Sequence, residues 1–218
     1  MSIETNPALI NQAHGAYLKL ERMIVTLELN PGAMYSEAEL IDKAQMGRTP
    51  VREAVQRLEI DGFMLVRPRM GIQIAEIKAS NFLKVLELRR VLEPILADAA
   101  TRSATAEHRS KISTCHDMMT ESVSTLNIKL YLDADKMFDR LLVDAAKNPF
   151  LEKILGPLQT HARRFWYHYI GTAELANSAA LHMPVMDAFK RQDPEQAKDM
   201  MRVLVEKMIA KATAGALD

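Results

Sequence analysis

The chain has 218 residues, and its 28 lysine and arginine side chains are balanced by 28 aspartate and glutamate side chains. This length allows two small domains. Zero formal net charge argues against a general nucleic-acid coat, which needs excess positive charge. The absence of a bilayer-length apolar run and of a basic, apolar leader predicts a cytoplasmic protein without a membrane partner. One cysteine, Cys115, excludes an intrachain disulfide and a thiolate zinc cluster.

Two helices are expected before the first cluster of arginines. Apolar residues recur at helical spacing from His14 to Glu28, and Asn30-Pro31-Gly32 then predicts a turn. Ser36 is expected to cap a second, short helix, because Glu39 three residues later completes a capping box.

A third helix is expected to begin at Arg48 or Thr49. Pro50 fits only in a first helical turn, and Thr49 before it is a candidate cap. Helical spacing predicts an inward stripe of Val51, Val55 and Leu58 and places four polar residues elsewhere: Arg48, Arg52, Gln56 and Arg57. Arginines in the first turns suit phosphate, because free N–H groups and the positive dipole end lie there.

Two short strands, 63–66 and 72–75, are expected around a turn that holds Pro68 and Gly71. Arg67 and Arg69 lie at its tip. Three helices with a two-stranded basic wing indicate a winged helix-turn-helix that grips a DNA duplex. Each arginine alone favours an ordinary solvated surface, so the prediction depends on their combination.

Residues from about His14 to Glu76 resemble the DNA-binding domain of the GntR superfamily of bacterial transcription regulators. The shared motifs are Pro31-Gly32, Ser36 to Leu40, and Arg-Thr-Pro-Val-Arg-Glu-Ala over 48–54. The resemblance implies that Arg48, Thr49 and Arg52 contact bases or phosphates and that Gly71 lets the wing approach the minor groove. The other predicted DNA contacts are Pro50, Gln56, Arg57, Arg67 and Arg69. Gly47 and Ala38 stand where the family commonly has serine and arginine, which predicts fewer phosphate contacts.

The rest of the chain reads as helical, so the fold class is mostly α: a winged helix-turn-helix over 1–76, a linker over 77–80, and an all-helical domain over 81–218. Its first long helix is expected to be interrupted by Pro94. The later helices are expected near 107–120, 126–146, 149–170, 173–191 and 194–212. The phrases 86–94, 137–142 and 145–151 resemble the FCD effector domain of the FadR-type branch, which implies a homodimer.

A divalent transition metal is one candidate ligand of this helical domain. Asp135 and Asp139 are four residues apart on one helix face, and two carboxylates with the imidazole of His182 suit zinc, nickel or manganese. The resemblance implies an aspartate and three histidines as ligands, and here Asp139 and Leu204 stand at two of the histidine positions. Solvated acids and a histidine bonded to a backbone carbonyl remain the alternative.

The resemblance implies an organic or sugar acid as the effector. Arg89 is a candidate partner, because a guanidinium holds a carboxylate with two parallel hydrogen bonds, although an ion pair with Glu93 explains it equally well. Arg163 and Tyr167 are further candidates.

The sequence therefore predicts a ligand-responsive regulator, a repressor rather than an enzyme, that binds a pseudo-palindromic double-stranded operator as a homodimer. Two alternatives stay open: a regulator whose effector pocket has decayed, and a metal-dependent hydrolase.

Overall fold

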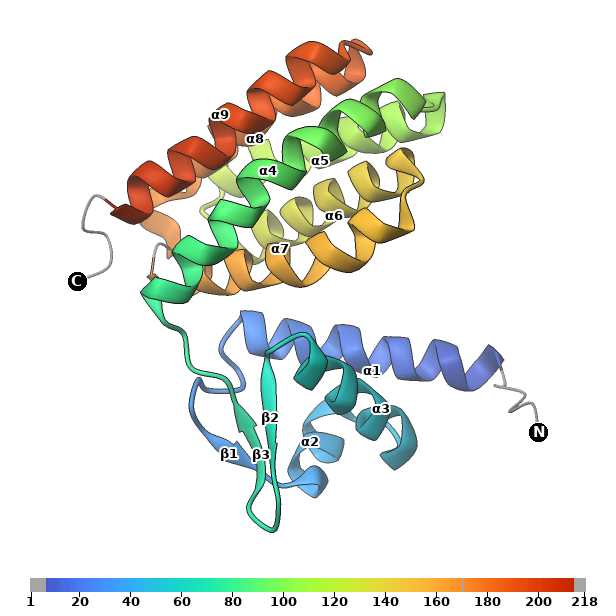
Figure 1. Cartoon of the computed structure of the whole chain (residues 1–218), viewed down its shortest axis with the longest axis vertical. Coiled ribbons are helices and arrows are strands. Elements are labelled where there is room, and N and C mark those ends of the chain that lie inside the picture. The colour runs from blue at the N-terminus through green and yellow to red at the C-terminus, as the bar shows by residue number, and fades with distance from the viewer. Residues whose placement is uncertain (1–6, 170, 214–218) are drawn as a thin grey trace. The chain divides into compact units, whose positions relative to one another are not determined.

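The computed structural model describes residues 7–169 and 171–213, which divide between Lys78 and Ala79 into two compact units (Figure 1). Within the described residues, no helix is both long enough and apolar enough to cross a membrane. The first unit contains three helices and three short strands: α1 Pro7–Val25, β1 Met34–Tyr35, α2 Glu37–Ala44, α3 Arg48–Ile60, β2 Met64–Arg67 and β3 Gly71–Ile74.

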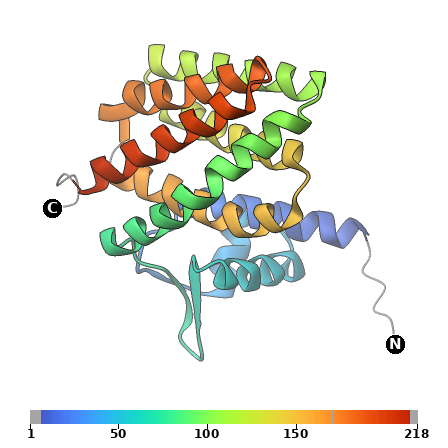
Figure 2. The ribbon, with the colours of Figure 1, turned by 45° about the horizontal axis from the view of Figure 1, so that its top comes forward.

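The sheet of the first unit has the order β1-β3-β2 and is antiparallel. The predicted two-stranded wing is present, and Met34 and Tyr35 pair with Gln73 and Ile72 to add a third strand to its sheet. The sequence does not reveal a strand this short. Figure 2 shows β2 and β3 as a long hairpin.

One apolar core joins the three helices of the first unit to the sheet. The inward stripe predicted for α3 is confirmed, since Val51 and Leu58 are fully buried and Val55 is nearly so. They pack in one cluster with Leu20 and Ile24 of α1. The predicted capping box is also present: the Ser36 hydroxyl accepts from the Glu39 N–H, and the Glu39 carboxylate accepts from the Ser36 N–H.

All regular elements among the described residues of the second unit are helices. Its elements are α4 Ala79–Ser103, α5 Ala106–Ser124, α6 Ile128–Ala146, α7 Pro149–Tyr169, the short 3-10 helix η1 Gly171–Glu174, α8 Leu175–Lys190 and α9 Pro194–Thr213. Helices α4 and α9 lie side by side (Figures 1 and 2). The boundary between the two units falls after Lys78, inside the linker expected over 77–80, and α4 starts at Ala79.

The predicted interruption at Pro94 is wrong, because α4 continues through it. A proline inside a helix costs about 3 kcal/mol through a lost hydrogen bond and a steric clash. Pro94 is buried, and α4 packs against α6, α7 and α9. Burial of a 25-residue helix against its neighbours outweighs this cost.

Candidate functional site

Helix α3 presents an uncapped first turn. It begins at Arg48 as predicted, but its N-cap is Gly47, which makes no side-chain hydrogen bond, so the capping role expected of Thr49 is wrong. Pro50 is the third helical residue and is buried. The free N–H groups of this turn and the positive dipole end favour an anion such as a DNA phosphate.

Among the predicted DNA contacts of α3, the exposed ones are Arg48, Thr49, Arg52, Gln56 and Arg57. Glu37 of α2 holds two of these arginines, with its carboxylate oxygens 3.1 Å from Arg48 Nε and 2.7 Å from Arg52 Nε. The arginine side chains stay 72% and 62% exposed in these pairs. They are therefore oriented by a protein carboxylate and still accessible to a second anion.

Two predicted DNA contacts also pack against the protein itself, although Arg57 stays 55% exposed. The Arg57 guanidinium lies 3.9 Å from the centre of the Tyr17 ring, and the Tyr17 hydroxyl donates to Asp61 at 2.9 Å. Arg57 therefore ties α3 to α1 through a cation–π contact. The ring of Pro50 belongs to the buried face of α3. Pro50 is therefore covered by the core, whereas the exposed part of Arg57 remains accessible to DNA.

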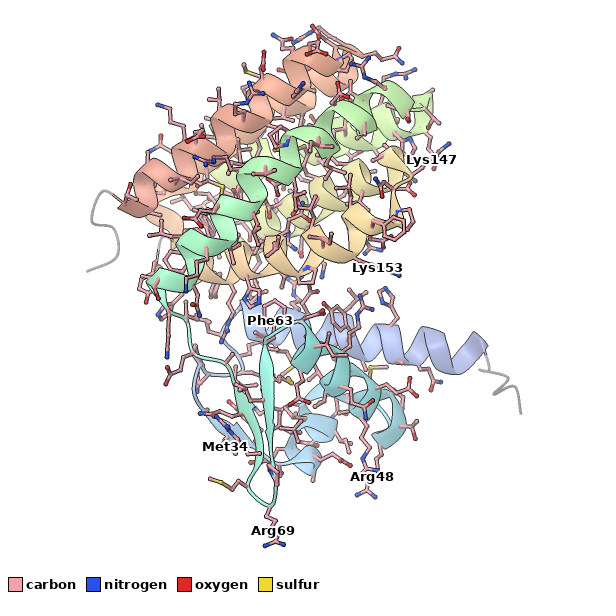
Figure 3. All side chains as sticks on the ribbon, in the orientation of Figure 1. Met34, Arg48, Phe63, Arg69, Lys147 and Lys153 are labelled. Carbon is pink, nitrogen blue, oxygen red and sulfur yellow. The ribbon has the colours of Figure 1, made fainter. Side chains whose placement is uncertain are left out.

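The wing carries two arginines in different settings. Arg69 lies at the hairpin tip with a positive φ of 63° and projects outward, as Arg48 does at the start of α3 (Figure 3). Arg67 donates from Nε and Nη2 to the Gln73 amide oxygen, 3.1 Å from each nitrogen, which braces β2 against β3. Gly71 has a φ of 118°, and a Cβ there would lie 2.7 Å from the Tyr35 carbonyl oxygen. The glycine is thus required for the approach of β3 to β1.

In the second unit, Arg163 of α7 bridges the two predicted acidic ligands of α6. Its Nη1 lies 2.5 Å from Asp139 Oδ2 and 3.3 Å from Asp135 Oδ2. Its Nη2 donates to the Thr160 hydroxyl at 3.0 Å. The exposed fraction is 9% for Arg163, 12% for Asp135 and 9% for Asp139, counted over their side chains. This is a buried charge cluster in which one guanidinium serves two carboxylates.

His182 of α8 completes the cluster. Its Nε2 lies 3.1 Å from Asp135 Oδ1, and its Nδ1 lies 2.8 Å from the Ser178 carbonyl oxygen. Burial lowers the pKa of His182, but the hydrogen bond and charge of Asp135, the Ser178 carbonyl and the charge of Asp139 together outweigh burial and raise it. Both ring nitrogens face acceptors, an arrangement that suits an imidazolium donating from each.

The two carboxylates of the cluster titrate in opposite directions. Burial raises the pKa of Asp135, but the hydrogen bond and charge of His182, with the charge of Arg163, lower it to about 2. Burial and the neighbouring charge of Asp135 raise the pKa of Asp139 to about 7, against the opposing charge of Arg163. The pair thus holds one carboxylate firmly ionised beside one that takes up a proton near neutral pH.

In the structure, the three predicted metal ligands pair with one another and with Arg163. Within the described residues, no group of three or more His, Cys, Asp or Glu side chains is arranged to hold a metal ion. The sequence reasoning placed Asp135, Asp139 and His182 together correctly but missed the cation between them. The His182 nitrogen that a metal would need faces Asp135 instead, and Leu204 at the fourth position is buried and has no ligating atom.

Arg89, the first predicted effector contact, forms an ion pair with Glu93 on the same helix. Its Nε and Nη2 lie 2.7 and 3.1 Å from the two Glu93 oxygens, and Gln159 of α7 donates to the same carboxylate at 3.3 Å. Both charged side chains are buried. The alternative of an internal ion pair, which the sequence left open, is the one present in the structure.

Two neighbouring cavities open among these helices and share four wall residues: Tyr131, Trp166, His182 and Met208. The larger has a volume of about 60 Å³ and mainly apolar walls, which include Phe82, Phe165 and Leu204. Lys207 and Lys211 of α9 also line it, and Lys211 is paired with Glu174. The smaller contains Arg89, Asp135 and Arg163. Tyr167 is not among the walls of either cavity.

Sequence reasoning missed Glu37, Thr160 and Gln159. Each is a common surface residue type, and each partner lies on another helix or a turn away. The sequence does place charged residues on the inward faces of amphipathic helices. Such residues need hydrogen-bond partners in the fold, but the sequence does not identify those partners.

Two family models match the chain. The model "Bacterial regulatory proteins, gntR family" matches residues 12–74, and the FCD domain model matches residues 84–207. The first match covers the head formed by α1 to β3, and the second covers the helices that hold the charge cluster and both cavities.

Relatives and a solved structure agree with these matches. An uncharacterized HTH-type transcriptional regulator of Escherichia coli, YieP, is 26% identical over 82% of this chain and 86% of its own. A probable D-xylose utilization operon transcriptional repressor of Paenarthrobacter nicotinovorans is 25% identical over 77% and 74%. The structure of E. coli McbR/YncC has a TM-score of 0.79 at 19% identity, covering 92% of this chain and 96% of that one. The chain therefore belongs to the GntR family of bacterial DNA-binding transcriptional regulators, with an FCD domain after its reading head.

Proposed function

We propose that this regulator is a ligand-responsive repressor: a small carboxylate binds in the helical unit of a homodimer and changes the affinity of two heads for a pseudo-palindromic operator. The observation that carries the proposal is an apolar cavity walled by α4, α6, α7, α8 and α9, in the same chain as exposed arginines on α3. The name of the Paenarthrobacter relative, a probable repressor, supports repression over activation.

The proposed contact for the effector carboxylate is Lys207. The sequence pointed to Arg89 and Arg163, but the charge of each guanidinium is already balanced by buried carboxylates. Lys207 is an exposed ammonium at the wall of the larger cavity. An acid with a small apolar or aromatic body would place that body beside Phe82, Phe165 and Leu204 and its carboxylate at Lys207.

Calorimetric titration of the full chain with carboxylates of graded apolar size tests this contact. Lys207→Met should weaken binding of the best acid about tenfold, equivalent to ~1.4 kcal/mol. Lys153→Met, on exposed α7 surface outside the cavities, is the matched control and should bind like the parent. Equal affinities for the parent and Lys207→Met would remove Lys207 from the effector site.

The dimer is proposed to form on an apolar stripe of α4. Leu88, Val91 and Ile95 recur at helical spacing on one face and are 52%, 59% and 52% exposed. In a dimer with a two-fold axis, the stripe of one copy would pack against the same stripe of the second copy and remove both from water. Light scattering should give a dimer for the parent and for Leu126→Glu, an exposed loop control, and a monomer for Val91→Glu. A dimeric Val91→Glu chain would place the interface elsewhere.

A regulator with a decayed pocket is the second candidate, and the neutralised Arg89 and Arg163 favour it. Operator affinity separates the two. An effector that prefers one placement of the heads by about 1 to 3 kcal/mol changes operator affinity about five- to 150-fold. DNA upstream of the protein's own gene, labelled and titrated with and without the acid, gives that ratio. No saturable binding of any acid, with operator affinity unchanged by each, would favour the decayed pocket. The hydrolase alternative is set aside, because the family consists of transcription regulators.

A further inference from the structure

We infer that the Arg163 guanidinium is the resident cation of the cluster formed by Asp135, Asp139 and His182, so that this FCD domain works without a divalent metal. The inference is independent of which effector binds. It starts from one nitrogen, Arg163 Nη1, which lies within hydrogen-bonding range of a carboxylate oxygen from each aspartate.

The guanidinium is held in place by more than its charge. Nη2 of Arg163 donates to the Thr160 hydroxyl at 3.0 Å, one turn earlier on α7. The side chain is 9% exposed, so withdrawing it into solvent would leave two carboxylates buried beside each other. Breaking a buried ion pair is strongly unfavourable, because the remaining charge has no compensation. A metal ion would have to displace a cation that the fold itself positions.

The histidine of the cluster is also engaged in a way that opposes a metal. A metal binds the lone pair of a neutral imidazole nitrogen. Nε2 of His182 faces Asp135 Oδ1 at 3.1 Å, and Nδ1 faces the Ser178 carbonyl oxygen at 2.8 Å. Donation to both acceptors uses both nitrogens. A divalent ion at this point would also meet the positive charges of Arg163 and His182 at short range.

Leu204 supplies the last observation. It stands at a position where the family resemblance implies a histidine ligand, it is 1% exposed, and it lines the larger cavity. An apolar side chain there and a guanidinium between the acids replace two parts of one metal centre. With Leu204 and Arg163 in these positions, the site has balanced charges and borders an apolar cavity.

Metal uptake by the full chain tests the inference. The parent, Asp135→Asn and Arg163→Ala are stripped with a chelator and titrated with Ni²⁺, Zn²⁺ and Mn²⁺ by calorimetry, with bound metal counted by elemental analysis. Asp135→Asn subtracts metal held at surface histidines. Circular dichroism melts establish that each variant is folded, and Arg140→Ala, an exposed arginine of α6, is the matched control.

The expected result is no Asp135-dependent uptake by the parent or by Arg140→Ala. Arg163→Ala should gain about one metal ion per chain, because its removal frees two carboxylates and an imidazole, and the added change Leu204→His should tighten that binding at least tenfold. One ion per parent chain, lost in Asp135→Asn, would overturn the inference even if Arg163→Ala does not fold. A folded Arg163→Ala chain that gains no metal would also overturn it.

Discussion

The two halves of the chain use arginine–carboxylate pairs in opposite ways. In the reading head, Glu37 holds Arg48 and Arg52, whose side chains remain 72% and 62% exposed. In the helical unit, Asp135 and Asp139 hold Arg163, which is 9% exposed. Exposed pairs contribute about 0–1 kcal/mol and exchange readily, whereas breaking a buried pair costs about 3–5 kcal/mol. The exposed ion pairs of the first unit can therefore exchange the carboxylate for a DNA phosphate, whereas the buried ion pairs of the second unit stabilise its fold.

Removing the buried cation should have the largest effect. Arg163→Met should lower the free energy of unfolding of the helical unit by about 3–5 kcal/mol, because two carboxylates lose their shared partner. Trp166, the only tryptophan, lies on α7 and reports urea unfolding of that unit by fluorescence. Arg140→Met, on exposed surface, should stay within about 0.5 kcal/mol of the parent. A similarly small change in the free energy of unfolding for Arg163→Met would mean that the cluster does not stabilise the helical unit.

The same cluster should make the helical unit less stable as pH rises from 4 to 8. The pKa of Asp139 is raised to about 7, so the folded state binds a proton that the unfolded state has released, and stability falls across that interval. The raised pKa of His182 acts in the same direction: its contribution is complete below the unfolded pKa and is lost as pH rises through the folded one. Asp135, with a pKa of about 2, loses its contribution only in stronger acid.

Urea midpoints from the Trp166 signal, measured between pH 4 and 8, check this direction. One proton gives a slope of at most about 1.4 kcal/mol per pH unit. Asp139→Asn removes the carboxylate whose pKa is raised and should flatten the decline below pH 7. Midpoints of the parent that rise towards pH 8 would contradict the assignment of the proton to this cluster.

In the reading head, substitution should change DNA affinity rather than stability. Arg48→Ala and Arg52→Ala should each weaken operator binding about 10- to 100-fold, or ~1–3 kcal/mol, and a lost phosphate contact should reduce the salt slope by about one. Fluorescence anisotropy with the upstream DNA measures both. Arg57→Ala is the contrast, because its guanidinium lies on Tyr17; it should cost less affinity and more stability. An Arg52→Ala chain that binds like the parent would move the reading surface away from α3.

How much the sequence foretold also differs between the units. The start of α3 at Arg48, its inward stripe and the capping box at Ser36 depend on residues within one turn of each other, and local spacing predicted them. Arg163 and Asp135 lie 28 residues apart on different helices, so only tertiary packing brings them together. Pro94 misled because propensity predicts a break, whereas the burial of α4 decides the outcome. The sequence therefore identifies charged residues that the helical unit buries, but not which of them form ion pairs.

The smallest expected effect is at Glu37, and its sign separates orientation from simple repulsion. Glu37→Gln removes one negative charge and should therefore raise the affinity for unrelated DNA. If Glu37 orients Arg48 and Arg52, the same change should also lower the ratio of operator affinity to unrelated-DNA affinity about threefold. That change lies within the ~1 kcal/mol that an exposed pair contributes. Glu53→Gln, on an exposed part of α3, removes the same charge and should raise both affinities while leaving the ratio unchanged. Competition binding in a fixed low salt buffer gives both ratios. Equal ratios for the two variants would show that Glu37 acts on the DNA only through its charge, since a carboxylate that merely repels phosphates cannot distinguish one sequence from another.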